Sequence, residues 1–357
     1  MNSPYTVQKV YLMLGSACNL KCRHCYQTGA DMPEPAKSID RSVLDFLREL
    51  AAMKAEQTQI VFWGGEPLLY RPLIETIVKA LPVQKFDFWL QTNGTLLTDE
   101  IVNFVNHYRI AVSVSCDGPD TAKVRGVNVF EDPDFCERFC RIRRRSIGTT
   151  VHAYNIDPHL LDEWIRARVG ETDIHYQYTL ECTFDMPKDL YAYDFRRYTD
   201  NLRKCRREFI DDTLKGHFHT PAHNVLRRGV AGVMDYVSRR EEGLPSRWWP
   251  ECASMRHTLN IDLEGNLHLC HNRRSIIGHV GDSWFTLLEN NDRLLKEAFA
   301  AKPECERCDV NFLCRHGCPL NPMSEGQKIC CEAERIYWIE AVKTVQDAAA
   351  ITTEIEL

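Results

Sequence analysis

The stretch KVYLMLGSACNLKCRHC, residues 9–25, sets an apolar run directly before three closely spaced cysteines. The run Lys9–Leu14 has the length and composition of a buried β-strand. Cys18, Cys22 and Cys25 follow it with three and two intervening residues, so one loop supplies three thiols. In parallel α/β folds the functional groups lie on the loops that follow the strands. The stretch therefore predicts a strand that leads into a metal-binding loop.

The sequence from about residue 8 to 180 repeats this pattern and predicts a parallel sheet with crossover helices. Amphipathic segments separate the strands: Ser38 or Asp40 can cap one helix, and Thr98 can cap another. With the first strand, six units are expected. The further strands are expected at Gln59–Trp63, Phe86–Gln91, Ile110–Ser115, Thr149–Tyr154 and Ile174–Leu180.

Three more of these strands end in loops with special residues. Gly64–Pro67 follows the second strand, Thr92–Gly94 the third and Asp117–Pro119 the fourth. Because the carboxyl ends of parallel strands meet at one edge of a sheet, we expect these loops to share a site with the cysteine loop.

Composition excludes several classes of protein. The 357 residues carry 44 lysines and arginines against 50 aspartates and glutamates without a long block of one sign, so neither nucleic acid nor an anionic membrane is an expected partner. With no secretory signal and no apolar stretch approaching about 18 residues, we expect a cytoplasmic protein that does not enter a membrane. Sixteen cysteines are unusual there, because reduced thiols are seldom needed in quantity except to bind metal or do chemistry.

Eight of the cysteines crowd into residues 252–331. A disulfide scaffold is expected in small secreted domains, which this chain does not resemble. Zinc remains an alternative metal, since tetrathiolate zinc sites also use closely spaced cysteine pairs. The spacing is Cys252-x12-Gly265-x4-Cys270, then Cys305-x2-Cys308-x5-Cys314-x3-Cys318, and then the pair Cys330-Cys331.

The first cysteine motif resembles the signature of radical S-adenosylmethionine (SAM) enzymes, and Gly64–Pro67 resembles their glycine–glycine–glutamate–proline motif. Three thiolates leave one iron of a [4Fe–4S] cluster open, and in this family that iron binds SAM. The resemblance implies reductive cleavage of SAM to a 5′-deoxyadenosyl radical. Local roles stay open for Ser115, Arg125 and Asn93, which can also serve backbone, surface charge or a turn. The implied SAM contacts are His24, Gly64, Gly65, Glu66, Asn93, Ser115 and Arg125.

The second cysteine group resembles a SPASM domain, which houses two auxiliary [4Fe–4S] clusters. That resemblance implies three [4Fe–4S] clusters in all, with SAM as the further cofactor. A cysteine that some relatives carry shortly after Cys252 is missing here, so either His257 completes the first auxiliary cluster or one iron stays open. The implied ligands are Cys252, Cys270 and Cys318 for the first auxiliary cluster, and Cys305, Cys308, Cys314 and either Cys330 or Cys331 for the second.

The two resemblances together imply an α/β fold: a partial (β/α)6 TIM-type barrel followed by a cysteine-rich SPASM domain. We expect the barrel at residues 8–187 and a mainly helical bridge at residues 188–250. The auxiliary-cluster domain is expected at residues 251–335, and a C-terminal helix and tail at residues 336–357.

The family usually modifies peptides or proteins, and two subclasses compete for this chain. Anaerobic sulfatase maturases, which form formylglycine, carry an aspartate base directly after the cysteine equivalent to Cys270, where this chain has His271. The sequence therefore favours a maturase of ribosomal peptides (RiPPs) that forms a C–C or thioether crosslink. His271 can itself accept a proton, since its reference pKa is near neutrality. The other candidate catalytic bases are Glu181, Asp185 and Asp262.

Two further classes stay open: a small-molecule dehydrogenase acting on a sugar or aminocyclitol, and a metal-binding protein without enzymatic activity. For the favoured class the expected partners are a peptide or protein substrate and a ferredoxin or flavodoxin as electron donor. Recognition of a leader peptide would use this chain or a separate leader-peptide-binding protein.

Overall fold

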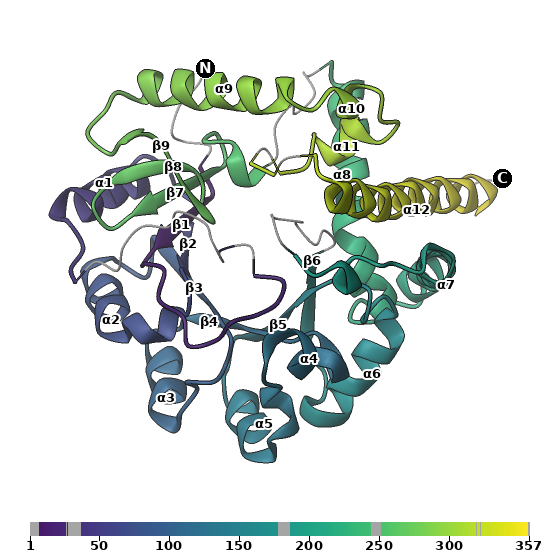
Figure 1. Cartoon of the computed structure of the whole chain (residues 1–357), viewed down its shortest axis with the longest axis horizontal. Coiled ribbons are helices and arrows are strands. Elements are labelled where there is room, and N and C mark those ends of the chain that lie inside the picture. The colour runs from purple at the N-terminus through teal and green to yellow at the C-terminus, as the bar shows by residue number, and fades with distance from the viewer. Residues whose placement is uncertain are drawn as a thin grey trace. The chain divides into compact units, whose positions relative to one another are not determined.

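The computed structural model describes residues 7–25, 27, 37–177, 186–243, 251–318, 320–321 and 323–355. The chain divides into two compact units. Unit 1 comprises residues 1–115, 131–146 and 249–301, and unit 2 comprises residues 116–130, 147–248 and 302–357. Each unit is therefore assembled from segments that are far apart in the sequence (Figure 1).

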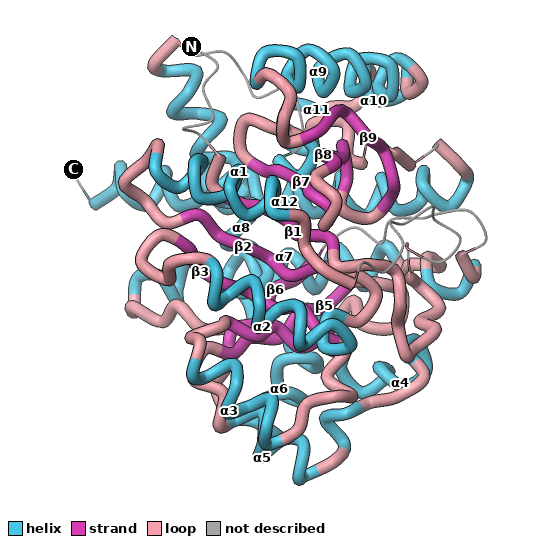
Figure 2. Tube along the Cα trace, turned by 90° about the vertical axis from the view of Figure 1, so that its left-hand side faces the viewer, coloured by secondary structure: helices cyan, strands magenta, loops and turns pink. Residues whose placement is uncertain are grey.

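Unit 1 is built on a mixed sheet in which β1 lies between β2 and β7 (Figure 2). From β4 to β7 the neighbouring strands are parallel, and the β7–β8–β9 part is antiparallel. In register, Leu12 of β1 lies opposite Phe62 of β2 and Ile261 of β7, and all three side chains are buried. Across this sheet the order is β4 (Ala111–Ser115), β3 (Phe86–Thr92), β2 (Thr58–Trp63), β1 (Lys9–Met13), β7 (Thr258–Asp262), β8 (Asn266–Cys270) and β9 (Arg273–His279).

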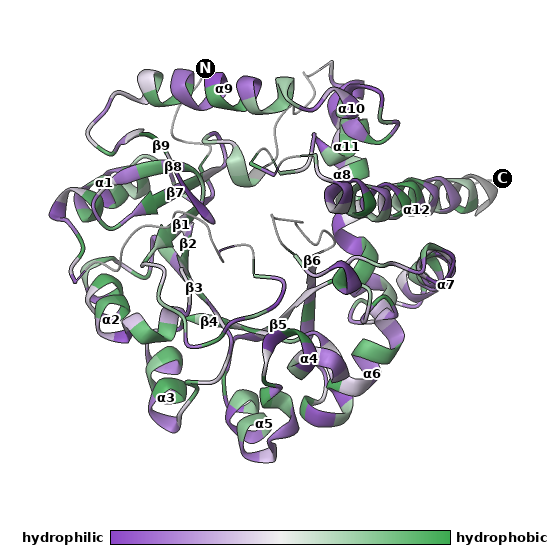
Figure 3. Cartoon of the chain, in the orientation of Figure 1, coloured by the Kyte–Doolittle hydropathy of each residue, from purple (hydrophilic) through white to green (hydrophobic). Residues whose placement is uncertain are grey.

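The helices of unit 1 are amphipathic, with hydrophobic and hydrophilic residues on each of them (Figure 3). The carboxylate of Asp40 caps α1 by accepting from the Ser42 amide, and the Thr98 hydroxyl caps α3. The Thr98 cap was expected from the sequence, and of the two candidates for the first cap, Ser38 and Asp40, the structure uses Asp40. The helices are α1 (Arg41–Ala52), α2 (Arg71–Ala80), α3 (Asp99–His107), α5 (Pro133–Cys140) and α9 (Trp284–Ala300), with short 3₁₀ turns η2 (Pro67–Tyr70) and η6 (Glu251–Ala253).

Unit 2 is mainly helical. Its long helices α8 and α12 approach closely at Gly229, where an added Cβ would lie 2.5 Å from the Tyr337 hydroxyl and 2.8 Å from the Ala341 Cβ. Strand β5 begins at the end of one unit 1 segment and continues into unit 2. The elements are η3 (Gly118–Asp120), α4 (Thr121–Arg125), η4 (Val129–Glu131), β5 (Arg145–Thr150), α6 (Pro158–Val169), β6 (Asp173–Gln177), η5 (Lys188–Leu190), α7 (Phe195–Leu214), α8 (Pro221–Glu241), α10 (Pro303–Glu306), α11 (Asn311–Cys314) and α12 (Glu325–Ile355).

Along the described chain each of the strands β1 to β6 is followed by a helix, which is the element order of a partial (β/α)6 TIM-type barrel. This confirms the predicted fold class. The first four strands lie within one residue of their predicted bounds, but the fifth was predicted four residues too late, at Thr149–Tyr154. The chain leaves the strand there because His152 starts a turn, with its Nδ1 accepting from the Tyr154 amide at 3.2 Å. The predicted end of the sixth strand, residues 178–180, lies outside the described residues.

Candidate functional site

The cysteine loop after β1 carries Cys18, Cys22 and Cys25 as free thiols. The Cys25 amide donates to the Cys22 carbonyl at 3.1 Å, which closes a turn between these two thiols. Burial raises the pKa of Cys18, and negative charge on Glu66 and Cys25 raises it further. Hydrogen bonds to its sulfur from the Leu20 amide and the Asn93 side chain oppose this increase. The thiols therefore lie together with residues of the neighbouring post-strand loops.

The glycine pair after β2 allows backbone to pack directly on backbone. A Cβ on Gly64 would lie 2.5 Å from the Gly15 carbonyl oxygen, and one on Gly65 would lie 2.3 Å from the Ala17 carbonyl oxygen. The Gly65 amide donates to Gly15 at 3.0 Å, and the Glu66 amide donates to Ala17 at 2.8 Å. In these contacts the glycines serve the cysteine loop itself, because a side chain would push that loop away.

Glu66 joins two loops through one buried carboxylate. Its Oε1 accepts from the Leu68 amide at 3.0 Å and from the Thr92 hydroxyl at 2.7 Å, and its Oε2 accepts from the Asn93 amide at 2.8 Å. Burial raises the pKa of Glu66, while these hydrogen bonds oppose the increase. Glu66 thereby fixes the loops after β2 and β3 relative to each other.

Asn93 carries the connection on to the cysteine loop. Its Nδ2 donates to the Asn19 Oδ1 at 2.9 Å, and the Asn19 Nδ2 donates to the Thr95 hydroxyl at 2.8 Å. Sequence reasoning did not assign a role to Asn19 or Thr95; the position of Asn19, directly after Cys18, was the available signal. We call Asn19, Glu66, Asn93 and Thr95 the loop clamp.

The other predicted SAM contacts are placed separately. His24 is buried within the cysteine loop, and Ser115 is the last residue of β4 in unit 1. Arg125, in unit 2, forms a two-pronged ion pair with the buried Asp117, with N–O distances of 2.6 and 3.1 Å. The Thr150 amide also donates to Asp117 at 3.1 Å. The Arg125 guanidinium thus has a carboxylate partner within the protein, and its contact with SAM stays a prediction.

Asp262, a predicted base, closes the turn between β7 and β8. Its carboxylate accepts from the Glu264 amide at 3.0 Å and from the Asn266 amide and side chain at 2.9 Å each. Its Oδ2 also lies 2.9 Å from Nε2 of the buried His268. Burial opposes ionisation, but the hydrogen bonds from His268 and Asn266 outweigh it and lower the pKa of Asp262. These contacts give the carboxylate a structural role in the hairpin. The predicted bases Glu181 and Asp185 lie outside the described residues.

His271 is a buried member of an aromatic cluster in unit 1. Its ring stacks on Tyr11 with centroids 3.9 Å apart and meets the Trp63 ring edge-on at 4.7 Å. Its Nδ1 lies 3.2 Å from the Asn260 Oδ1. Burial, assisted by the positive charge of Lys9, lowers the pKa of His271 to about 3. The imidazole is therefore neutral at neutral pH and packed among aromatic rings.

Asn260 also organises two of the predicted ligands of the first auxiliary cluster. Its Nδ2 donates to the Cys252 carbonyl at 3.2 Å and to the Leu269 carbonyl, next to Cys270, at 3.2 Å. One buried amide therefore holds the backbones of both cysteine segments in unit 1. The third predicted ligand, Cys318, belongs to unit 2.

The predicted second auxiliary set lies within unit 2. The Cys308 amide donates to the Cys305 carbonyl at 3.2 Å, so a turn joins these two cysteines. Burial raises the pKa of Cys314 well above its usual range, and negative charges on Cys331, Cys308 and Cys305 add to the increase. Of the pair in α12, the structure thus brings Cys331 towards the other three thiols, whereas Cys330 is a buried residue with 1% exposure.

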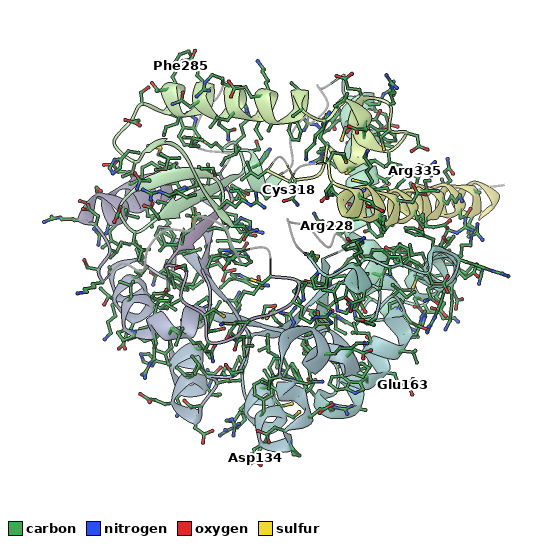
Figure 4. The ribbon with its side chains drawn as sticks, in the orientation of Figure 1. Asp134, Glu163, Arg228, Phe285, Cys318 and Arg335 are labelled. Carbon is green, nitrogen blue, oxygen red and sulfur yellow. The ribbon has the colours of Figure 1, made fainter. Side chains whose placement is uncertain are left out.

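Two local features shape the backbone around these thiols. Arg315 and His316, between Cys314 and Cys318, have φ angles of 57° and 68°, a left-handed conformation that non-glycine residues seldom adopt. In α12, Arg335 (labelled in Figure 4) makes two hydrogen bonds of 2.7 and 2.8 Å to Asp309, directly after Cys308. This ion pair holds the helix that carries Cys331 against the turn of the other cysteines.

The donor sets fit iron–sulfur clusters, because they consist of thiols grouped in threes and fours. Each thiolate of a cubane cluster binds a different iron. Within the described residues no group of three or more histidine, cysteine or acidic side chains is close enough to hold a single ion. The described cysteines in both motifs are free thiols, as cluster ligands must be before assembly.

No helix in the described part of the chain is both long and apolar enough to cross a membrane.

A family model matches part of the chain, and some known proteins match most of it. Residues 12–151 match the Radical SAM superfamily. The chain is 31% identical over 358 residues to a serine-type anaerobic sulfatase-maturating enzyme of Klebsiella aerogenes, covering 92% of this chain and 84% of that protein. A cysteine-type enzyme of Clostridium perfringens strain 13 is 21% identical, covering 85% and 86%. Other matches are local. A serine-type anaerobic sulfatase-maturating enzyme of Bacteroides thetaiotaomicron is 33% identical over 124 residues. In this match and in two further local matches, the chain spans only 30–40% of the relative's length.

Solved structures share the fold. Native anSMEcpe with bound AdoMet and Cp18Cys peptide gives a TM-score of 0.66 at 19% identity, covering 96% of this chain and 99% of that one. Streptococcus suis SuiB bound to precursor peptide SuiA gives a TM-score of 0.54 at 15% identity, covering 90% and 75%.

Proposed function

The chain belongs to the radical SAM family of SPASM-type maturases that includes the anaerobic sulfatase-maturating enzymes, and from this membership we propose that it oxidatively modifies a side chain of a peptide or protein. Iron–sulfur clusters and SAM are its cofactors. When bound, they supply one-electron cleavage of SAM and abstraction of a hydrogen atom from the substrate.

The observation that carries the assignment of the SAM-binding cluster is the loop clamp. Three thiols lie in one post-strand loop, and Glu66 and Asn93 tie that loop to its two neighbours. Because Glu66 is fully buried and each of its carboxylate oxygens accepts a hydrogen bond, it is suited to hold the loop rather than to react. We assign Cys18, Cys22 and Cys25 to the SAM-binding cluster.

The remaining cysteines we assign to two auxiliary clusters. Next to Cys270 in the sequence, the buried His271 ring stacks on the half-buried Tyr11 ring and meets the buried Trp63 ring edge-on. Cys331, and not Cys330, takes the fourth position of the second set. The assigned ligands are Cys252, Cys270 and Cys318 for the first auxiliary cluster, and Cys305, Cys308, Cys314 and Cys331 for the second.

For the substrate we propose a ribosomal peptide that receives a C–C or thioether crosslink. Supporting this subclass, the residue after Cys270 is an imidazole enclosed by aromatic rings, where sulfatase maturases place a carboxylate base. Formylglycine formation is the second candidate, favoured by the similarity to a serine-type anaerobic sulfatase-maturating enzyme along most of the chain. In either case a ferredoxin or flavodoxin would deliver the electron, and a separate protein could present the leader peptide.

The test is product analysis by mass spectrometry. The reconstituted protein is incubated anaerobically with SAM, dithionite and either a short peptide encoded beside its gene or a sulfatase-derived peptide containing Cys or Ser. A crosslinked peptide has lost two hydrogen atoms and does not react with a hydrazine. A peptide that contains formylglycine carries an aldehyde, which forms a hydrazone with a hydrazine.

A matched pair of variants controls this experiment. Cys22→Ala must abolish modification, while Cys140→Ala, which removes an exposed thiol of α5 outside all three sets, must preserve it. Peptide modification by the Cys22→Ala variant would refute the proposal. SAM cleavage without modification of any peptide would instead favour a small-molecule dehydrogenase.

A further inference from the structure

Lys302 is a buried lysine in the cysteine-rich part of unit 2. Its side chain is only 4% exposed, and it precedes α10, three residues before Cys305. Its ammonium group donates a hydrogen bond to the backbone carbonyl of Cys318. Lysine is almost never buried to this extent unless it is paired, so its burial points to negative charge nearby.

The assigned ligands of the second auxiliary cluster supply that negative charge. Burial raises the pKa of Cys305 and of Cys331, and in both the positive charge of Lys302 opposes the increase. The Cys305 amide also donates to the Lys302 carbonyl at 3.1 Å, so Lys302 lies directly beside this ligand set. The same side chain touches Cys318, which is assigned to the first auxiliary cluster.

A second charge acts on this set in the opposite direction. Glu334, in α12, is half-buried, and its negative charge raises the pKa values of Cys314 and Cys331 in addition to the effect of burial. Its own partners are the Trp338 side chain, which donates to it at 2.8 Å, and the positive charge of Arg228. A cluster held by four thiolates next to this carboxylate concentrates negative charge in a poorly solvated region. A buried cation beside the thiols offsets part of this charge.

We propose that Lys302 is a positioning residue that raises the reduction potential of the second auxiliary cluster and couples its ligand set to Cys318. The inference rests on the proposed assignment of Cys305, Cys308, Cys314 and Cys331 to that cluster. Reduction adds one electron to an already anionic group, so a nearby cation stabilises the reduced form more than the oxidised form. Because Lys302 is buried, solvent screens this effect little.

The experiment compares Lys302→Met and Lys302→Gln in the full chain, in a background where Cys18, Cys22 and Cys25 are replaced by Ala. That background removes the SAM-binding cluster, so only the auxiliary clusters contribute to the signal. Glutamine keeps an N–H donor for the Cys318 carbonyl but removes the charge, whereas methionine removes both. Iron and sulfide are counted first, and an anaerobic redox titration followed by electron paramagnetic resonance then gives the two potentials.

We expect both variants to keep the two auxiliary clusters. One of the two reduction potentials, that of the second auxiliary cluster, should be lower than in the background protein with Lys302 intact. The expected change is about tenfold or more in the reduction equilibrium, which is a shift of about 59 mV for a one-electron couple. Lys328→Met is the matched control, since Lys328 lies three residues before Cys331 but its side chain is 58% exposed and lies 3.5 Å from Glu304. Its removal should leave both potentials unchanged.

Three results would overturn the proposal. Unchanged potentials in both Lys302 variants would remove the electrostatic role, and an equal shift in Lys328→Met would show that the effect is not specific. Loss of about four irons from both Lys302 variants would make Lys302 a folding residue. If the background protein with Lys302 intact already lacks those irons, the cluster assignment fails first and the inference falls with it, so the two failures are distinguishable.

Discussion

Replacing Gly65 with alanine tests how the cysteine loop is held. The new Cβ would lie 2.3 Å from the Ala17 carbonyl oxygen and 2.5 Å from the Ser16 carbonyl oxygen, so backbone has to move. Overpacking of this kind costs about 1–3 kcal/mol. Weakening the amide hydrogen bonds that Gly65 and Glu66 donate to the cysteine loop adds about 0.5–1.5 kcal/mol each. The loop should lose its geometry before the rest of the fold, because total stability is about 5–15 kcal/mol.

The assay is iron content after anaerobic reconstitution, read together with SAM cleavage. We expect Gly65→Ala to lose about four of about twelve irons and its production of 5′-deoxyadenosine, while the auxiliary irons remain. Gly281→Ala is the control, because a Cβ there would make only an ordinary contact of 3.6 Å with the His279 ring. Full iron content and undiminished cleavage in Gly65→Ala would refute the idea that these glycines fix the cysteine loop.

Further predictions concern the second cysteine set, the β7–β8 turn and unit 2. Cys331→Ser should lower the iron content by about four per chain, whereas Cys330→Ser should not; equal losses would contradict the assignment. Asp262→Asn should destabilise the protein by about 1–3 kcal/mol at pH 7 in urea unfolding. Hydrogen bonds, including one with His268, hold the pKa of Asp262 in the folded protein below its unfolded value of about 3.9. The stabilisation by the carboxylate is therefore present above about pH 3.9 and is lost as the pH falls through the folded pKa. A difference that persists in acid would exclude the carboxylate as its source. Gly229→Ala should cost about 1–3 kcal/mol in the same assay, because its Cβ would meet side chains of α12; an unchanged unfolding midpoint would show that the helices adjust freely.

Local sequence signals were enough to predict most of the fold. Apolar runs such as Lys9–Leu14 are buried strands in unit 1, and Asp40 and Thr98 cap helices because their side-chain oxygens reach backbone amides of the first turn. The fifth strand was misplaced because its residues, Arg145–Thr150, are mostly polar and its end is set by hydrogen bonding, including the Cys116 amide to the Gly148 carbonyl. An apolar-run criterion cannot detect such a strand.

The candidate site was only partly predictable, because contacts between distant parts of the chain decide which side chains come together. Cysteine spacing identifies the ligand candidates, but the choice of Cys331 over Cys330 depends on how α12 is rotated about its axis. The stacking of His271 on Tyr11 joins residues far apart in the sequence and arises from the pairing of β1 with β7. A residue-by-residue interpretation could not foresee that His271 is enclosed by rings.

We propose above all that this chain is an iron–sulfur enzyme with a separable SAM-cleaving cluster. The most direct test counts iron, sulfide and 5′-deoxyadenosine in the anaerobically reconstituted wild type and in a variant with Cys18, Cys22 and Cys25 replaced by Ala. We expect about twelve irons per chain in the wild type and about eight in the variant, which should no longer form 5′-deoxyadenosine. Bound zinc without sulfide in the wild type, or 5′-deoxyadenosine formation that survives in the variant, would contradict it.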